Sequence, residues 1–251
     1  MTIENDEQLA KLKAIGRIVA DVLQRMMRYA EPGMTTAELD AHGAELLERE
    51  GARSAPQLTY GFPGATCISV NEEVAHGIPG ARVLAAGDMV NVDVSAEKDG
   101  FFADTGGSFV IPPVSPEKQR LCFATREALQ NAMREARAGQ PLNRIGKAIE
   151  QTAKRKGFRV ITNLCSHGTG GALQEYPEEI YGYHEPRDNR VLREGMVITI
   201  EPFLSNRNRF VEESDDGWTL VGRPGSISAQ YEHSMVITRG QPIVLTQPTA
   251  A

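Results

Sequence analysis

The sequence contains few cysteines, and their spacing suggests neither a bridge nor a metal site. Cys67, Cys122 and Cys165 are the only cysteines in 251 residues, and no two of them form a C-x-x-C pair. A disulfide framework is typical of short secreted chains with an even number of cysteines. We therefore expect three reduced thiols and no structural zinc site built on cysteine.

Long apolar runs, a signal segment and a strong excess of one charge are also missing. No apolar stretch approaches the roughly 18 residues of a membrane span, and the first ten residues, MTIENDEQLA, have neither a basic nor an apolar region. The 33 acidic and 27 basic residues give a net charge of −6, which creates no general field for nucleic acid or anionic membrane. We expect a cytoplasmic protein with no membrane contact and no direct nucleic-acid specificity.

The chain repeats one pattern of elements. Apolar spacing, caps and breakers predict four helices in two pairs, over residues 7–29, 35–51, 115–139 and 143–157. Thr35 or Thr36 caps the second helix, with Glu38 completing a capping box. Strand residues follow each pair. Gly33 and Gly51 have counterparts in Gly139 and Gly157 at one constant offset. This self-similarity predicts a duplication with halves of roughly 7–112 and 115–246.

The duplication restricts the fold. Neither half can bury its sheet face alone, so both are expected to pack around one mostly antiparallel sheet with helices on the outer face. The sequence therefore predicts an α+β fold with a pseudo-twofold axis. No Gly/Ser-rich linker separates the halves, which predicts a single domain over residues 1–251.

Two aspartates lie in a predicted β-hairpin. The alternating valines of residues 90–94 place Asp93 on the polar face of a half-buried strand, and Asp99-Gly100 is a strong signal for a two-residue turn. With that turn, Asp93 and Asp104 become diagonal neighbours with Cα atoms about 7–8 Å apart. Two converging carboxylates repel unless a cation or a proton lies between them. The alternatives are a solvated hairpin face and a metal site.

Each half supplies one histidine and two acids. The six residues are His76, Asp93 and Asp104 in the first half and His167, Glu201 and Glu232 in the second. Unpaired carboxylates are costly in strand-rich segments, so four acids indicate more than one cation. A set rich in carboxylates and free of thiolates suits Mn, Fe or Co, with Zn as a further candidate. Two such ions can activate water and polarise a carbonyl for hydrolysis.

Five segments, in this order and spacing, resemble type I methionine aminopeptidases of the pita-bread metallopeptidase superfamily. They are NEEVAHGIPG, VNVDVSAEKDGFFADT, SHGTGG, TIEPFLS and SAQYEHSMVIT. The resemblance runs from the first helix to about residue 245 and implies the duplicated fold. It also implies that a metal-bridging water or hydroxide removes an initiator methionine when the second residue is small. The implied partners are the N-termini of nascent proteins and peptides, with transient ribosome contact, and the implied enzyme is monomeric.

The resemblance also assigns site residues. The implied ligands of two divalent ions are Asp93, Asp104, His167, Glu201 and Glu232. Asp104 and Glu232 would bridge the ions, His167 and Glu201 would complete one site, and Asp93 would complete the other. Glu201 would also transfer the proton, and His76 would hydrogen-bond the substrate.

A methionine pocket is implied as well. Its expected lining consists of Thr59, Phe62, Cys67 and Trp218. The alternative for Phe62 and Trp218 is an ordinary place in the core, and Cys67 has the same alternative. Pro56 and Thr59 stand where many relatives carry Cys and Tyr, which leaves the shape of the pocket open.

One position departs from the family pattern. A second histidine is expected seven residues after His167, but this chain has Gln174. Glutamine can donate or accept a hydrogen bond to the substrate, but it cannot become cationic near pH 7 or shuttle a proton. We therefore expect two-metal binding with slow or altered turnover. His184 is a candidate substitute, although it lies beside Pro186 in an expected loop.

Three other functions compete with this assignment. A prolidase relative is disfavoured because those enzymes usually carry a large N-terminal domain. The lack of the type II insertion and of a zinc-binding extension favours a bacterial-type enzyme. A binding protein that keeps the fold without turnover is disfavoured because it would have no need for four converging carboxylates. An aminopeptidase of different specificity stays an alternative.

Overall fold

The four predicted helices form, and local signals explain most of their ends. In the computed structural model, which describes residues 1–248, α1 is Asp6–Tyr29, α2 is Thr36–Arg49, α4 is Pro116–Glu135 and α5 is Asn143–Lys156. The predicted capping box joins Thr35 and Glu38, and Gly157 ends α5 in the left-handed conformation. The last three residues of the predicted 1–251 domain lie outside the described residues.

Two predictions of local structure are wrong. The helix expected to reach Gly139 ends at Glu135, because the N–H groups of Ala138 and Gly139 donate to Thr238 and Leu192 in other segments. After Gly51 only β1 (Arg53–Ser54) is extended, and a short helix, α3 (Ala55–Tyr60), follows at once. The signals for α3 are Ser54 as its N-cap, Pro56 in its first turn and Gly61 as its left-handed C-cap.

The predicted hairpin is present with the predicted register. It consists of β4 (Met89–Lys98) and β5 (Phe101–Val110), and Asp99 and Gly100 have φ values of 54° and 81° in the turn. Ser95 lies opposite Asp104, so Asp93 and Asp104 are diagonal neighbours, as expected. The expectation of a half-buried strand is wrong, because the polar face of β4 is buried too. Asn91, for example, is 7% exposed and donates to Gln230 in the second half of the chain.

The remaining strands are short, and every strand pair is antiparallel. They are β2 (Cys67–Val70), β3 (Glu73–Ala75), β6 (Arg159–Val160), β7 (Cys165–Gly168), β8 (Glu175–Tyr181), β9 (Val197–Ile200), β10 (Phe203–Ser205), β11 (Glu212–Glu213), β12 (Leu220–Val221), β13 (Ser228–Gln230), β14 (His233–Val236) and β15 (Ile243–Val244). The larger sheets have the orders β1-β4-β2, with β5 on β4, and β15-β14-β9-β7-β8. They meet where Gly107 pairs with Tyr231 and Glu232 N–H donates to Gly106 O.

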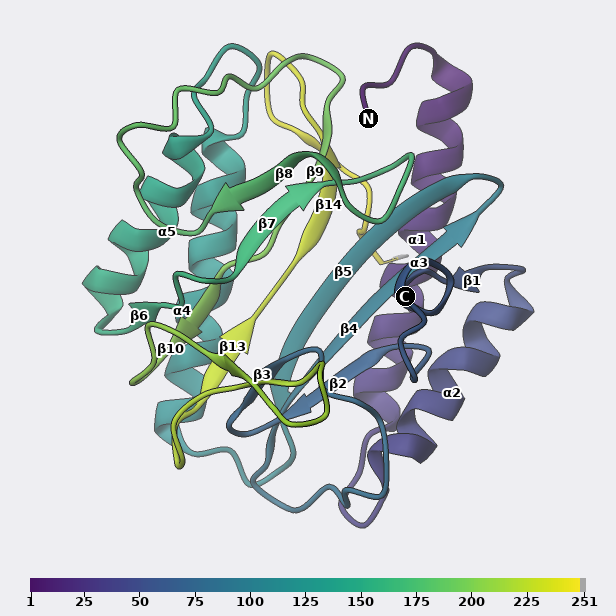
Figure 1. Ribbon diagram of the computed structural model, residues 1–251, viewed down its shortest axis with the longest axis vertical. Helices are drawn as coiled ribbons and strands as arrows, with labels where there is room; N and C mark the ends of the chain where they lie inside the picture. The colour runs from purple at the N-terminus through teal and green to yellow at the C-terminus, as the bar shows by residue number, and fades with distance from the viewer. Residues whose placement is uncertain (249–251) are drawn as a thin grey trace.

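The helices cover the strands in two groups. Figure 1 shows α1 and α2 beside the β4–β5 hairpin on the right, and α4 and α5 beside β10 and β13 on the left. One apolar core lies between α1, α2 and the hairpin, and another lies between α4, α5 and the strands of the second half. The fold is therefore α+β, with the helices on the outer faces of the strands and the strands toward the viewer in Figure 1. Among residues 1–248, no helix has the length and apolarity needed to cross a bilayer.

Candidate metal centre

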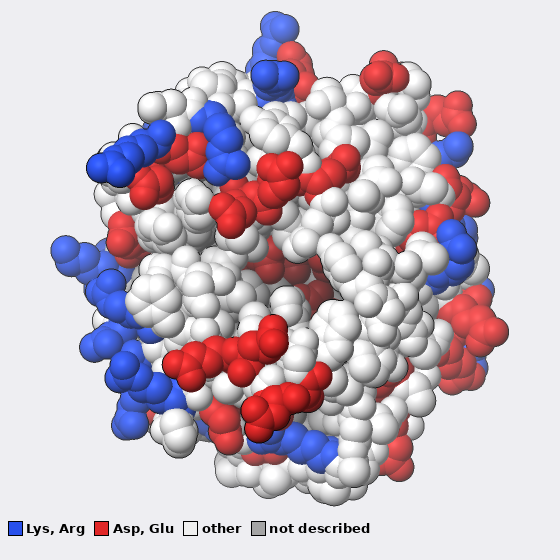
Figure 2. All heavy atoms as spheres, in the orientation of Figure 1, with Lys and Arg blue, Asp and Glu red and all other residues white. Residues whose placement is uncertain are grey.

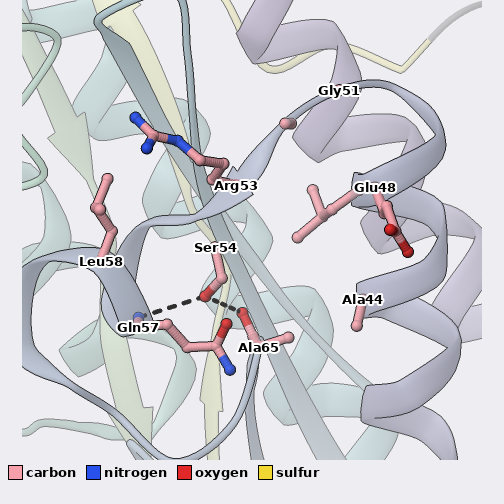
Figure 3. Close-up of a pocket in the computed structure, with 10 residues that line it drawn as sticks. Ala44, Glu48, Gly51, Arg53, Ser54, Gln57, Leu58 and Ala65 are labelled. Carbon is pink, nitrogen blue, oxygen red and sulfur yellow. Dashed lines mark hydrogen bonds between the residues drawn. The ribbon is translucent and has the colours of Figure 1, made fainter.

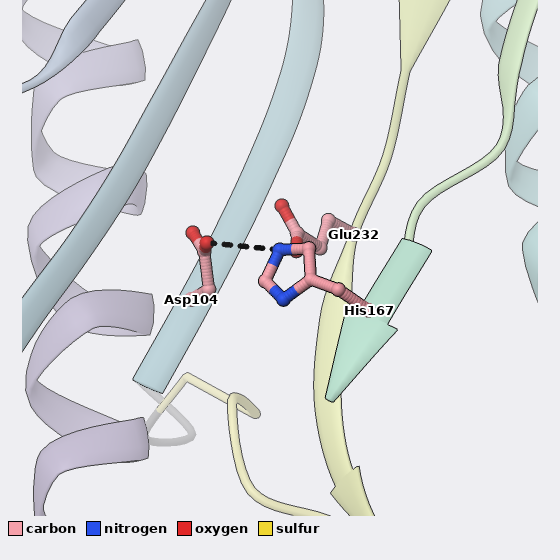
Figure 4. A group of neighbouring side chains, drawn as sticks. All are labelled: Asp104, His167 and Glu232. Carbon is pink, nitrogen blue, oxygen red and sulfur yellow. Dashed lines mark ion pairs between the residues drawn. The ribbon is translucent and has the colours of Figure 1, made fainter. Parts of the chain in front are cut away.

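Three acidic or imidazole side chains converge where the two halves meet. Asp104 projects from β5, His167 from β7, and Glu232 from the residues between β13 and β14 (Figure 4). Each offers one potential ligand atom, and these atoms lie within 4.8 Å of one another. All three residues are buried. The group has the composition and spacing of a metal site.

The other two predicted ligands lie against this group. His167 Nε2 is 3.5 Å from Glu201 Oε1 and 3.8 Å from Asp104 Oδ2. Asp93 lies on the neighbouring strand β4, close enough to Asp104 that the Asp104 carboxylate raises the pKa of Asp93 beyond the effect of burial. The structure therefore brings together all five residues that the sequence singled out as ligands.

Electrostatics within the cluster oppose ionisation. Burial raises the pKa values of Asp93, Glu201 and Glu232 well above their usual range, and the charge of Asp104 raises each of them further. A hydrogen bond from Thr199 opposes this effect at Glu201. A cation among these groups would reverse the balance, because it would favour their charged forms.

Unpaired oxygen atoms provide a separate test of whether a metal fits. The described residues contain three buried side-chain oxygens without a hydrogen-bond partner, and two of them are Asp104 Oδ1 and Glu232 Oε1. Buried polar atoms normally have a partner because desolvation without one is costly. Both atoms belong to the residues expected to bridge two ions. The donor set therefore fits divalent metal ions.

A polar network behind the ligands was missed by the sequence analysis. Gln230 is 1% exposed; its Nε2 donates to Glu232 Oε2 at 3.0 Å, and its Oε1 accepts from Asn91 at 2.9 Å. On the other side, Ser166 Oγ accepts from Glu201 N–H, and Thr199 Oγ1 accepts from His167 N–H. The available signal was Gln230 itself, which lies two residues before Glu232 in a strand-like segment. Such contacts orient the ligand side chains.

His76 lies beside the acids at the end of β3. Its backbone has a φ of 54°, which is uncommon outside glycine. The residue is exposed, but desolvation by the surrounding protein lowers the pKa of its imidazole. Asp104 raises this pKa and His167 lowers it. Its neighbours thus include two of the ligands.

The four residues expected to line a methionine pocket differ from one another in burial and in neighbours. Phe62 and Trp218 form an edge-to-face pair with ring centroids 5.2 Å apart. Cys67 lies opposite Asp93 in the β2–β4 register and is half-buried. Thr59 is exposed on α3, and no hydrogen bond joins its side chain to the other pocket residues among those described. The structure thus pairs the two aromatics and places Cys67 next to a ligand.

Gln174 has a partner that the sequence analysis did not identify. Tyr60 Oη donates to Gln174 Oε1 at 2.8 Å, and the charge of Asp104, after burial, raises the pKa of Tyr60. His184 is not brought to this group. It lies beside α5, where its N–H donates to Glu150.

The acids lie at the bottom of a hollow in the strand side of the molecule. Figure 2 shows acidic atoms deep in the middle of this face, between uncharged atoms, with further acidic side chains on the surface above and below them. Another groove, of about 610 Å³, lies between α2, β1 and α3 (Figure 3). Glu48 is the only acidic residue among those lining that groove, so the groove lacks the ligands of a metal site.

The sequence matches Metallopeptidase family M24 over residues 10–239. The chain belongs to this family. Methionine aminopeptidase 2 of Bacillus subtilis is 47% identical over 248 residues, which cover 98% of this chain and 100% of that protein. The methionine aminopeptidase of Escherichia coli K12 is 38% identical, with 98% of this chain and 94% of that protein covered.

Solved structures of similar proteins agree with this assignment. A methionine aminopeptidase from Thermotoga maritima matches with a TM-score of 0.94 and 33% identity, covering 98% of this chain and 100% of that one. A prolidase from Pyrococcus furiosus matches with a TM-score of 0.77 at 19% identity, which shows a shared fold. The pita-bread fold is thus confirmed. Family membership and the buried cluster together indicate a divalent metal site in this chain.

Proposed function

We propose that the protein is a methionine aminopeptidase of bacterial type, which removes the initiator methionine from proteins and peptides with a small second residue. The observation that carries the proposal is the buried cluster with two unpaired oxygens, Asp104 Oδ1 and Glu232 Oε1. The named relatives at 38–47% identity over nearly the whole chain support the same activity. A single catalytic domain over residues 1–251, with duplicated halves 7–112 and 115–246, completes the proposal.

The five clustered residues would hold two divalent ions, of which Mn, Fe and Co suit this donor set best and Zn is a further candidate. Asp104 and Glu232 would be shared by the two ions, His167 and Glu201 would hold one of them, and Asp93 would hold the other. When bound, the ions supply Lewis acidity toward the peptide carbonyl and lower the pKa of a water molecule. The short distances within the cluster support this assignment.

Other side chains bind the peptide and move its protons. Glu201 accepts a proton from the attacking water and returns it to the leaving amine. His76 and Gln174 hydrogen-bond the peptide. The methionine side chain packs against Phe62 and Trp218, with Cys67 and Thr59 completing the lining. The edge-to-face contact of the two aromatics supports an apolar wall for such a pocket.

The partners of this enzyme are the N-termini of nascent chains, and the enzyme acts in the cytoplasm as a monomer with transient contact to the ribosome. Four exposed basic residues on one side of the molecule support the ribosome contact. They are Lys154, Arg159, Arg207 and Arg209, and none forms an ion pair within residues 1–248. Figure 2 shows basic atoms gathered along the left edge, where α5 and β6 lie in Figure 1.

One assay tests the activity. The purified protein, supplied with Mn or Co, is incubated with Met-Ala-Ser and with Met-Lys-Ser, and free methionine and bound metal are measured. We expect release from Met-Ala-Ser alone and about two ions per chain. Metal binding without release from either peptide would favour the binding-protein alternative. Equal release from both peptides would indicate an aminopeptidase of different specificity.

A further inference from the structure

One hydrogen bond near the candidate site joins the two halves of the chain. Tyr60 and Gln174 are 114 residues apart, and Tyr60 Oη donates to Gln174 Oε1 at 2.8 Å. Both side chains are exposed, and Tyr60 is 47% exposed. Exposed side chains usually exchange rotamers freely, so a direct bond between two of them restricts both.

The Tyr60 end of this bond is anchored. Tyr60 is the last residue of α3, and Gly61 caps the helix with N–H bonds to Gln57 and Pro56 carbonyls. At the other end of α3, Ser54 Oγ accepts from Gln57 N–H and donates to Ala65 O, as Figure 3 shows. The backbone that carries the tyrosine is therefore fixed on both sides.

The Gln174 end is anchored as well. Gln174 lies in the turn between β7, which carries His167, and β8. Within this turn Thr169 Oγ1 donates to Ala172 O, and Gly171 N–H donates to Glu175 Oε1. The preceding residue, Leu173, is buried. The Gln174 amide thus extends from a turn that hydrogen bonds and a buried neighbour hold in place.

The pair lies close to the acids. The charge of Asp104 is felt at the Tyr60 hydroxyl, where it adds to burial in raising the pKa of that group. Gln174 follows His167 by seven residues in the turn described above. Tyr60 is thus linked to the cluster through the charge of Asp104, and Gln174 through the turn that follows His167.

We propose that Tyr60 is a positioning residue, which holds Gln174 Oε1 so that the amide NH₂ group donates to a carbonyl oxygen of the bound peptide. The inference rests on the proposed aminopeptidase function and assigns a role at that site to one further residue of this chain. Among the described residues, Gln174 Nε2 has no hydrogen-bond partner. A flip of the amide would place NH₂ against the tyrosine hydroxyl, which would then accept rather than donate. In the orientation present here, the Tyr60 hydroxyl holds Oε1 and leaves the amide NH₂ group free to donate.

A double-mutant cycle with the metal-loaded enzyme tests this role. Gln174→Ala removes the donor and is expected to lower kcat for Met-Ala-Ser by about 10–100-fold, below the 10²–10³ typical of a full oxyanion donor. Tyr60→Phe keeps the ring and is expected to lower kcat about tenfold, with KM changed less than about twofold. In the Gln174→Ala background, Tyr60→Phe should cost nothing further. Tyr29→Phe, at an exposed tyrosine stacked on His42, is the matched control without effect.

A second measurement does not depend on turnover. The side-chain amide resonances of Gln174, followed by ¹⁵N NMR, should report a restricted amide in the wild type and a mobile one in Tyr60→Phe. The single tryptophan, Trp218, belongs to the proposed methionine pocket, so its fluorescence should report binding of free methionine. That binding should be unchanged in Tyr60→Phe, as should the metal content.

The outcomes separate this inference from the proposed function. If the wild type releases methionine but Tyr60→Phe lowers kcat by the same factor with and without Gln174, the positioning role is overturned and the aminopeptidase function stands. An equally mobile Gln174 amide in both proteins would overturn it too. If the wild type releases no methionine from Met-Ala-Ser, the proposed function fails, and the inference fails with it.

Discussion

Asp104 has different surroundings at its two carboxylate oxygens. Oδ2 lies 3.8 Å from His167 Nε2, whereas Oδ1 is buried without a partner. Its charge raises the pKa values of Asp93, Glu201 and Glu232 after burial, so it is the acid that interacts with all the others. At the residue scale, Asp104 is therefore the side chain on which the proposed two-metal site would most depend.

Asp104→Ala is expected to bind fewer than two ions per chain and to lose activity, because one carboxylate would serve both ions. Elemental analysis after gel filtration measures the metal content. Asp99→Asn, in the exposed turn of the same hairpin, should keep both ions. Two tightly bound ions in the Asp104 variant would rule out the bridging assignment.

Gln174→His restores the imidazole that the resemblance leads one to expect. If the amide limits turnover, we expect kcat/KM for Met-Ala-Ser to rise, by up to about tenfold, since an imidazole can also become cationic. Steady-state kinetics on the metal-loaded proteins measure the change. An unchanged kcat/KM would mean that an amide held by Tyr60 serves as well as an imidazole.

At the scale of elements, the close approach of β5 to β13 depends on a glycine. A Cβ at Gly106 would lie 2.3 Å from Gln230 Oε1, whereas a Cβ at Gly107 would have no neighbour nearer than 3.5 Å. Gln230 cannot move without losing its bonds to Asn91 and Glu232. The hairpin and β13 therefore hold the Glu232 carboxylate through one tightly packed contact.

Gly106→Ala is expected to lower the free energy of unfolding by about 2 kcal/mol and to weaken metal binding, because overpacking displaces the Gln230 amide. Gly107→Ala on the same strand is the matched control and should change both quantities little. Urea denaturation and metal titration measure them. Equal effects of the two substitutions would show that the Gln230 contact is unimportant.

The segment between β8 and β9 depends on an ion pair. Asp188, which is buried, accepts hydrogen bonds from Arg190, and Arg190 also donates to Glu179 O. These bonds from Arg190 hold the pKa of Asp188 below its usual range, although burial opposes them. The folded pKa therefore lies below the unfolded one. The stabilisation is complete above about pH 4 and is lost as the pH falls through the folded pKa.

Asp188→Asn is expected to lower the free energy of unfolding at pH 7 by about 2 kcal/mol, and by much less near pH 3. Denaturation curves at the two pH values measure this. Glu194→Gln, which breaks the exposed pair with Arg239, should cost under about 1 kcal/mol. A difference between Asp188→Asn and the wild type that did not shrink in acid would contradict the expected role of the carboxylate charge.

On the scale of the whole molecule, basic side chains gather on one side despite the net charge of −6. The groove between α5, β6 and Arg209 has a volume of about 520 Å³ and includes Lys154 and Arg159 in its lining. Phe210, 68% exposed, adjoins it in sequence. An RNA backbone offers the complementary charge, and an unpaired base can stack on an exposed aromatic.

Replacing Arg159, Arg207 and Arg209 together by Ala is expected to weaken ribosome binding at least tenfold at 100 mM salt and to flatten its salt dependence. Co-sedimentation with ribosomes measures both. Turnover of Met-Ala-Ser should be unchanged, since these residues lie outside the site. Replacing Lys13, Arg17 and Arg25 on α1 removes the same charge elsewhere and is the control. An equal loss of ribosome binding in both triple variants would show that only the total charge of the protein matters.

The sequence by itself determined the local structure and the chemical types of the ligands. Thr35 with Glu38, Asp99-Gly100 and Gly157 act within a few residues of their own position, so caps and turns could be predicted where they occur. The convergence of Asp93 and Asp104 also follows from hairpin register. Helix ends such as that of α4 were predicted less well, because the competing hydrogen bonds come from distant segments.

Only the tertiary structure decided which distant side chains meet. Asn91 and Gln230 are 139 residues apart, and their contact buries the polar face of β4, which alternation alone predicts to face water. Tyr60 and Gln174 likewise meet across 114 residues. Local sequence preferences carry no information on such pairs, because these contacts form only when the two halves pack against each other. That packing depends on the shape and burial of both surfaces together.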